Sequence, residues 1–238
     1  MLPIRDVNPT RATPFVTVTF IAACLIVFFG IQARDTPDDA NEFLFRQAAI
    51  SCELLTGEPL SAFEINNQVC SDEPETPVFP EKQPFLAIFT SMFLHGSIAH
   101  VLFNMWFLWI FGNNVEEAFG HFGFALMYVA GGVAATVAFV LPNPDSTVPL
   151  VGASGAIAAV LGAYGVLFPA HRVLTFVGWF LIPVPAALFL GIWFFAQFGL
   201  GGSNVAWEAH VGGFIFGLVV ALVFRRSLLR RVPHAYSS

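Results

Sequence analysis

Residues 150–169 read LVGASGAIAAVLGAYGVLFP, a stretch without a charged side chain. About 20 mostly apolar residues are enough for a helix to cross a bilayer. The many Gly and Ala residues are typical of membrane helices that pack closely against their neighbours. The stretch therefore predicts a closely packed membrane helix, with Ser154 near its beginning.

The rest of the chain contains five more stretches of this kind. The sequence of 238 residues is 56% hydrophobic and only 11% charged, whereas an average soluble domain has about 25% charged residues. We therefore predict an all-α, polytopic membrane protein, a bundle of six transmembrane helices. The other five spans are residues 14–33, 97–114, 121–141, 173–199 and 207–225.

Two of these spans leave alternatives open. Residues 173–199 contain Pro183 and Pro185, so we expect this helix to be kinked or broken there. Residues 14–33 follow two arginines, and a signal peptide would begin in the same way. The apolar region is longer than the roughly 7–15 residues of a signal sequence, and no A-x-A cleavage site follows it. These features favour a span that is retained.

The basic residues predict the orientation. With six spans both chain ends lie on one side, and that side holds seven of the ten Lys and Arg residues. The positive-inside rule puts this side in the cytoplasm. We expect an integral protein of a bacterial inner (plasma) membrane, with a cytoplasmic N-terminus (1–13), a six-helix domain (14–225) and a basic cytoplasmic tail (226–238). No basic stripe favours nucleic acid as a partner.

The segment 34–84, between the first two spans, is acidic and is expected outside the cytoplasm. It carries eleven Asp and Glu residues against three Lys and Arg. We expect a structured or partly ordered external loop. Its two cysteines, Cys52 and Cys70, can pair in an oxidising compartment or remain free thiols. No Cys/His cluster has the spacing of a zinc site, so no metal is expected.

Polar side chains are costly inside a membrane, and each is by default a functional hypothesis. The second span carries His100 and Asn104, the fourth Ser154 and the sixth His210. His100 and Asn104 are four residues apart and share one helix face. These three spans run in the same direction, and all four residues lie within about one to two turns of the external end. The pattern predicts one site that opens to the external side.

Each of these residues also has a purely structural explanation. A Ser among glycines is typical of small-residue packing, and a lone membrane His or Asn more often joins helices by hydrogen bonds. Glu208 is two residues from His210 and faces roughly the other way on a helix, so we do not assign it as an acid partner. The common depth favours a site. Glycines expected to serve helix packing are Gly152, Gly155, Gly213 and Gly217.

Three segments together resemble the rhomboid intramembrane serine proteases, over about residues 14–225. They are His95…His100-Val101-Leu102-Phe103-Asn104, Gly152-Ala153-Ser154-Gly155 and Ala209-His210-Val211-Gly212-Gly213. The resemblance implies a Ser–His dyad, in which Ser154 attacks the scissile carbonyl and His210 acts as general base and then as general acid. It further implies an oxyanion site of His100, Asn104 and the Ser154 backbone N–H, with His95 in a structural role.

The resemblance also implies the substrate class. Such enzymes cut single-pass membrane proteins in or near the outer part of the transmembrane segment, without a metal or organic cofactor. Two departures from the family pattern concern positioning. Segment 34–84 has no Trp, although many members carry a Trp-Arg pair there, and Ala158 stands where some members have an aromatic ring stacked on the catalytic His. How His210 is oriented is therefore left open.

Two other functions compete with proteolysis. A catalytically silent relative could bind or escort membrane clients, although such relatives usually lack the Ser or the His. A small transporter or channel could use the same polar residues, but it would spread them through the membrane depth. The inner halves of these helices are instead almost wholly apolar.

Overall fold

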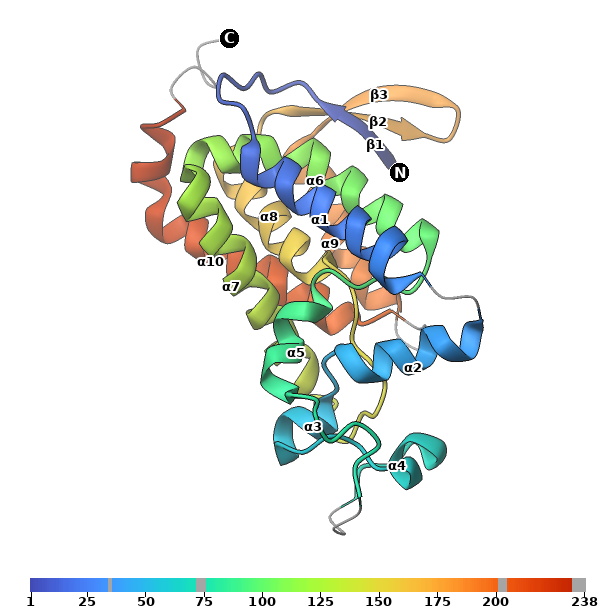
Figure 1. Cartoon of the computed structure of the whole chain (residues 1–238). Coiled ribbons are helices and arrows are strands. Elements are labelled where there is room, and N and C mark those ends of the chain that lie inside the picture. Colours follow the sequence, from blue (N-terminus) through green and yellow to red (C-terminus); the bar gives the residue numbers. More distant parts are fainter. Residues whose placement is uncertain (34–35, 72–75, 201–204, 233–238) are drawn as a thin grey trace.

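Helix α8 (Ser154–Leu167) is the centre of the helical bundle. The computed structural model describes residues 1–33, 36–71, 76–200 and 205–232. Eleven of the fourteen residues of α8 are buried, and four other helices pack against it (Figure 1). These four are α6 (Ile98–Phe119), α7 (His121–Val140), α9 (Ala186–Gln197, followed by a 3-10 turn over Phe198–Leu200) and α10 (Trp207–Leu229). Helix α1 (Phe15–Ile26), continued by a π-helix over Val27–Gln32, packs against α6 and α7.

Glycines on α10 let this helix lie directly on α8. A Cβ atom at Gly217 would be 1.8 Å from the carbonyl oxygen of Ala159, and one at Gly213 would be 2.1 Å from that of Gly155. Real Cβ atoms essentially never come closer than 3.0 Å to such neighbours. Only glycine therefore permits this separation of the two backbones, which is the purpose of small-residue motifs in membrane helices.

The six predicted spans agree with the structure to different degrees. By length and composition, three described helices can cross a membrane: α1 with its π-helical continuation, α7 and α10. Helices α8 and α9 are apolar but shorter. The fourteen residues of α8 rise only about 21 Å, against roughly 30 Å for a hydrocarbon core. The mostly helical fold is confirmed, whereas the count of six spans is not.

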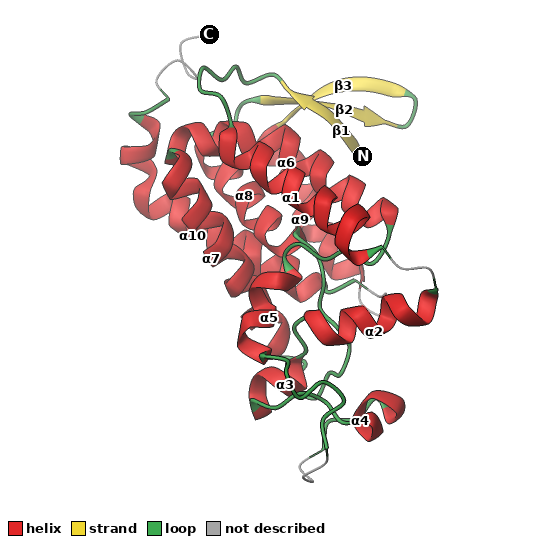
Figure 2. Cartoon of the chain, in the orientation of Figure 1, coloured by secondary structure: helices red, strands yellow, loops and turns green. Residues whose placement is uncertain are grey.

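Residues 173–185 are not helical, so the prediction of a helix over 173–199, kinked or broken at the prolines, is wrong in its first half. They belong to strands β2 (Arg172–Val177) and β3 (Phe180–Pro185), which pair antiparallel, and α9 begins only at Ala186. Strand β1 (Leu2–Asp6), in the segment expected as an N-terminal extension, pairs antiparallel with the other side of β2. The fold is therefore not purely α, and the sheet lies at one end of the bundle (Figure 2).

The two prolines that suggested a kink fit the free edge of β3. The N–H of Ala186 donates to the His171 carbonyl at 2.7 Å, and N–H groups alternate in direction along a strand. The backbone nitrogens of Pro183 and Pro185 therefore face away from β2. Proline has no N–H to donate, but on this side of the strand no hydrogen bond to β2 is lost. Gly178, at φ +59°, begins the two-residue turn between the strands.

The described part of the segment expected as an external loop (34–84) contains three helices, and a fourth begins at its last residue; all four lie at the end of the bundle opposite the sheet (Figures 1 and 2). A disulfide joins Cys52 to Cys70, so the paired alternative is the one that the structure contains. Cys52 packs in a small apolar core with Ile50 and Leu60. The helices are α2 (Pro37–Gln47), α3 (Ser51–Thr56), α4 (Ala62–Asn67) and α5 (Pro84–Ser91).

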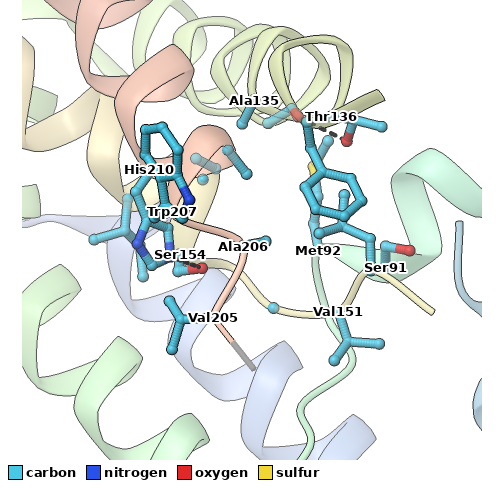
Figure 3. Close-up of a pocket in the computed structure, with 18 of the residues that line it drawn as sticks. Ser91, Met92, Ala135, Thr136, Val151, Ser154, Val205, Ala206, Trp207 and His210 are labelled. Atoms are coloured by element: carbon cyan, nitrogen blue, oxygen red, sulfur yellow. Dashed lines mark hydrogen bonds between the residues drawn. The ribbon is translucent and has the colours of Figure 1, made fainter. Parts of the chain in front are cut away.

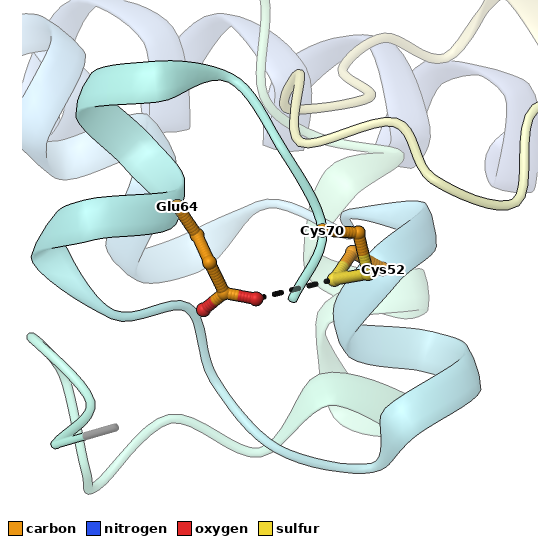
Figure 4. A group of neighbouring side chains, drawn as sticks. All are labelled: Cys52, Glu64 and Cys70. Atoms are coloured by element: carbon orange, nitrogen blue, oxygen red, sulfur yellow. Dashed lines mark hydrogen bonds between the residues drawn. A yellow bond between two sulfur atoms is a disulfide. The ribbon is translucent and has the colours of Figure 1, made fainter. Parts of the chain in front are cut away.

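Two buried carboxylates hold this external segment together. Glu53 Oε2 lies 2.5 Å from Lys82 Nζ, and both side chains are 2% exposed. Glu64 accepts the backbone N–H groups of Ser61 (2.8 Å) and Ser71 (3.0 Å), which ties the start of α4 to the chain that follows it. Glu64 also lies beside the disulfide (Figure 4). Because neither sulfur is a thiolate, this Cys–Glu group is not a metal site.

At the sheet end of the bundle, a buried polar cluster joins the sheet to the helices. Asp6 Oδ2 accepts hydrogen bonds from Asn114 Nδ2 (2.5 Å) and from the Tyr164 hydroxyl (2.9 Å). Burial raises the pKa of the Asp6 carboxyl to about 7. Nearby, Glu116 of α6 accepts the N–H of Thr17 at 2.7 Å, so it caps the first turn of α1. The polar side chains at this end thus bind one another and join the fold.

Candidate active site

Ser154 and His210 are in direct contact. The Ser154 Oγ and the His210 Nε2 are 2.8 Å apart, a hydrogen-bond distance. Ser154 is the first residue of α8, and His210 lies in the first turn of α10. The close approach of these helices through Gly213 and Gly217 brings the two first turns together. A nucleophile and a base in hydrogen-bond contact are the minimal arrangement for nucleophilic catalysis.

The pair lies on the wall of a large cavity. This cavity has a volume of about 810 Å³ and lies between the ends of α5, α6, α7, α8 and α10. Figure 3 shows His210 and Ser154 together on one side, with Met92, Ala135 and Thr136 across the space. Cavities of roughly 300–1,000 Å³ are typical of ligand sites. The volume is thus sufficient for a few residues of a peptide chain beside the serine.

Two polar side chains of α6 line the same cavity. Asn104 and His100 both line the cavity with Ser154. Asn104 is 7% exposed, and its Nδ2 has no hydrogen-bond partner among the described residues. The N–H of Ser154 is among the first N–H groups of α8, which have no acceptor inside their helix. Asn104, His100 and Ser154 thus line the same cavity.

Gly152 allows the loop before Ser154 to turn beneath His100. Its φ is +125°, a conformation that L side chains rarely adopt. A Cβ atom here would be 2.9 Å from His100 Nε2 and 3.4 Å from Ser154 Oγ. Gly155 instead faces α7, where its Cβ would be 2.4 Å from that of Ala135. Both glycines therefore serve close packing around the serine.

His95, assigned a structural role, is fully buried beside the site. Its N–H donates to Gln32 Oε1 at 3.0 Å, and its carbonyl accepts from Gln32 Nε2. Its ring lies edge-on to that of His100, with centroids 5.1 Å apart. His95 thus joins the end of the first apolar helix to the start of α6. Gln32 is not among the residues predicted from the sequence, although an amide at the end of an apolar span is a signal for such a contact.

Two further residues of α9 touch His210, and the sequence analysis missed both. The Gln197 Oε1 is 2.7 Å from the His210 Nδ1. The ring of Trp193 packs beside the imidazole, with centroids 6.1 Å apart and planes inclined by 34°. Ala158 is buried under this region without a ring of its own. The orientation of His210, open in the sequence, is therefore set from α9.

Glu208 takes no part in this contact. Its Oε1 accepts a long hydrogen bond from Asn143 Nδ2 at 3.4 Å, at the end of α7. Glu208 also lines the cavity. The side chain in contact with His210 Nδ1 is instead an amide, that of Gln197.

Comparison with known proteins agrees with this arrangement. The family model described as Rhomboid domain matches residues 82–227, more than half of the chain. The chain is 34% identical over 134 residues to Rhomboid protease GluP of Bacillus subtilis (strain 168), covering 56% of this chain and 25% of the relative. It is 30% identical over 144 residues to Rhomboid protein 1, mitochondrial, of Saccharomyces cerevisiae (56% and 40%). It is 32% identical over 146 residues to RHOMBOID-like protein 12, mitochondrial, of Arabidopsis thaliana (53% and 42%).

The matched region spans a quarter to about two fifths of the length of these three relatives. The Rhomboid domain match, residues 82–227, includes every candidate site residue from His95 to His210. The family model and the apolar helices together identify an integral membrane protein. The chain belongs to the rhomboid family.

Proposed function

We propose that this protein is an intramembrane serine endopeptidase with Ser154 as nucleophile and His210 as base. The main support is the 2.8 Å contact between Ser154 Oγ and His210 Nε2 on the wall of a cavity. A serine hydroxyl is a weak nucleophile unless a base removes its proton. The contact supplies that base within the membrane region of the chain.

The chemistry proceeds in two halves. As Ser154 Oγ attacks the scissile carbonyl, His210 Nε2 takes the hydroxyl proton, and an ester replaces the peptide bond when that proton passes to the leaving amine. Water then attacks the ester carbonyl and loses a proton to Nε2. As the bond between Ser154 Oγ and the acyl carbon breaks, Nε2 returns this proton to Oγ, which restores the serine hydroxyl and releases the acid product, ionised as a carboxylate. No metal or organic cofactor is required for these steps.

The tetrahedral intermediate carries a negative oxygen, and the proposed oxyanion donors are Asn104 Nδ2, His100 and the Ser154 N–H. The buried amide of Asn104 supports this role because its Nδ2 lacks an acceptor among the described residues. The start of α8 adds a partial positive charge at the same place. Losing one such donor typically costs about 10²–10³ in rate.

The proposed substrates are single-pass membrane proteins, cut in or near the outer part of their transmembrane segment. A helical substrate must unwind locally before a carbonyl can reach Ser154, so Gly or Pro near the cut should help. We further propose that both chain ends face the cytoplasm and that the site opens to the other side. The clustering of Lys and Arg at the chain ends supports this orientation.

The experiment compares the parent with four single variants, each reconstituted in liposomes with a tagged single-span substrate. We expect cleavage by the parent and none by Ser154→Ala or His210→Ala. Asn104→Ala should be slower by about 10²-fold but not silent. Ser146→Ala is the matched control, because Ser146 also lines the cavity but does not contact His210, and it should cleave like the parent.

Labelling by a fluorophosphonate probe gives a second readout. Ser154 should react in the parent and fail to react after His210→Ala. A Ser154→Ala variant that cleaves at the parental rate would refute the mechanism. A parent that binds the substrate but neither cleaves it nor reacts with the probe would favour the silent, client-binding alternative.

A further inference from the structure

We propose that Gln197 is a positioning residue that holds His210 in the tautomer and orientation required for catalysis. The inference rests on the proposed dyad and adds a third member to it, supplied by a different helix. Gln197 Oε1 and His210 Nδ1 are 2.7 Å apart, while His210 Nε2 faces Ser154. The three side chains thus form a continuous hydrogen-bonded row from α8 through α10 to α9.

The direction of the Gln197 amide follows from its other contact. Its Nε2 donates to the carbonyl oxygen of Trp193, one turn earlier on α9, at 2.9 Å. A carbonyl oxygen only accepts, so the amide nitrogen must face Trp193 and the amide oxygen must face His210. The reversed amide would put two oxygens against each other.

The amide direction in turn fixes the proton on His210. Because Gln197 Oε1 only accepts, His210 Nδ1 must carry a hydrogen and donate it. In the neutral imidazole Nε2 then has the free lone pair, and this lone pair faces the Ser154 hydroxyl. The opposite tautomer would leave Nε2 protonated and unable to take the serine proton, which stops the first step.

Burial makes this contact specific. Gln197 is only 5% exposed, so an amide oxygen without a donor there would be an unsatisfied buried group. The Trp193 ring covers the imidazole from the same helix. Gln197 and Trp193 are four residues apart and share one helix face. Helix α9 thus restrains the His210 ring by its hydrogen bond to Gln197 and by the packing of Trp193. Ala158, in contrast, has no aromatic ring that could stack on His210.

The test uses two substitutions of the same side chain. Gln197→Leu keeps approximate size but removes the acceptor, whereas Gln197→Glu keeps an acceptor and adds a negative charge. Phe195→Leu is the matched control, because Phe195 is on α9 but 71% exposed. All are reconstituted with the same tagged single-span substrate, after thermal unfolding has established that each is folded.

We expect kcat of Gln197→Leu to fall about 10- to 100-fold with little change in KM, because the misoriented base slows chemistry and leaves binding intact. Gln197→Glu should retain cleavage, and the acid limb of its pH–rate profile should move to higher pH. A carboxylate stabilises the imidazolium, so the base stays protonated to a higher pH. The shift of this limb tests the contact between residue 197 and His210, whereas the selective fall of kcat in Gln197→Leu tests the positioning role and would be absent for a purely structural glutamine.

The tautomer itself can be observed by ¹⁵N NMR of the His210 imidazole. The parent should show a protonated Nδ1, and Gln197→Leu a mixture of tautomers. A folded Gln197→Leu with parental kcat and acid limb would overturn the inference and leave the dyad intact. Should Gln197→Leu fail to fold, an unchanged acid limb in Gln197→Glu overturns it equally. Cleavage by Ser154→Ala would instead overturn the proposed function itself.

Discussion

Replacement of Gly217 by alanine tests whether helix packing at a distance holds the candidate site together. Gly217 lies two turns after His210 on α10, and it does not line the cavity. Its added Cβ would be 1.8 Å from the Ala159 carbonyl oxygen and 2.7 Å from the Ala159 Cα. These are backbone atoms of a buried central helix, so no side-chain rotation can relieve the contact.

The size of the effect follows from that distance. Since real Cβ contacts essentially never fall below 3.0 Å, α10 must move away from α8 by roughly 1 Å or more. Overpacking of this kind costs about 1–3 kcal/mol, partly offset by the roughly 1 kcal/mol that alanine gains over glycine in a helix. If part of the movement reaches the first turns, the 2.8 Å contact between Ser154 and His210 is lost. A displacement of about 1 Å can cost about 10²-fold in rate.

Two assays measure these effects separately. Thermal unfolding in detergent should show that Gly217→Ala is less stable than the parent, and the liposome assay should show cleavage slower by 10- to 100-fold, as roughly estimated above. Gly191→Ala on α9 is the matched control, because nothing lies within 4 Å of its Cβ position. It should match or exceed the parent in stability. Parental stability and rate in Gly217→Ala would show that α8 and α10 do not pack this closely, and the reasoning would fail.

Three further predictions concern the two ends of the bundle. Burial raises the pKa of the Asp6 carboxyl from 3.8 to about 7. Between these two pH values the folded state therefore keeps a proton that the unfolded state loses. The free energy of unfolding should fall as the pH rises from about 4 to about 7, by about 1.4 kcal/mol per pKa unit, and then level off. Asp6→Asn should flatten this profile of thermal unfolding, and an unchanged slope would exclude Asp6 as its source. Reduction of the Cys52–Cys70 disulfide, which closes a sequence separation of 18 residues, should cost about 3 kcal/mol and speed proteolysis of the external helices; an identical intact mass before and after reductant would contradict the pairing. Lys82→Met leaves the Glu53 carboxylate buried without its 2.5 Å partner and should destabilise by about 3–5 kcal/mol, while the double variant with Glu53→Gln should recover much of this loss.

Hydrophobicity predicted the helices well wherever a long apolar run could only be helical. Residues 121–141 and 207–225 correspond closely to α7 and α10, because twenty apolar residues cannot form one buried strand. The helix prediction failed for residues 173–185, because no long apolar run decides the structure there. Each half of this segment is a short apolar run, and such a run fits a strand or a helix equally well. The partner that decides between them is β1, more than 160 residues away along the chain.

The site could be predicted in part, because its ionisable residues are conspicuous in an apolar sequence. His100, Ser154 and His210 were found by their common depth, and the structure brings His210 and Ser154 into contact. Gln32 and Gln197 were not predicted, because burying a neutral amide in a membrane costs less free energy than burying an ionisable side chain. An amide is therefore a weaker sign of a functional site. Moreover, Gln197 lies on the span whose boundaries were wrong, so its depth could not be compared with that of His210.

The register between α8 and α10 links the packing glycines to the catalytic pair. Gly217 faces Ala159 and Gly213 faces Gly155, so the helices advance by four residues each between successive contacts. One more step toward the helix starts leads to Ala209, whose carbonyl oxygen is 3.7 Å from the Cβ position of Gly155. Helix α8 begins at Ser154, directly before Gly155, and His210 directly follows Ala209 on α10. Because parallel helices in a fixed register cannot slide at one end alone, the glycines that read as packing residues also determine where the base meets the serine.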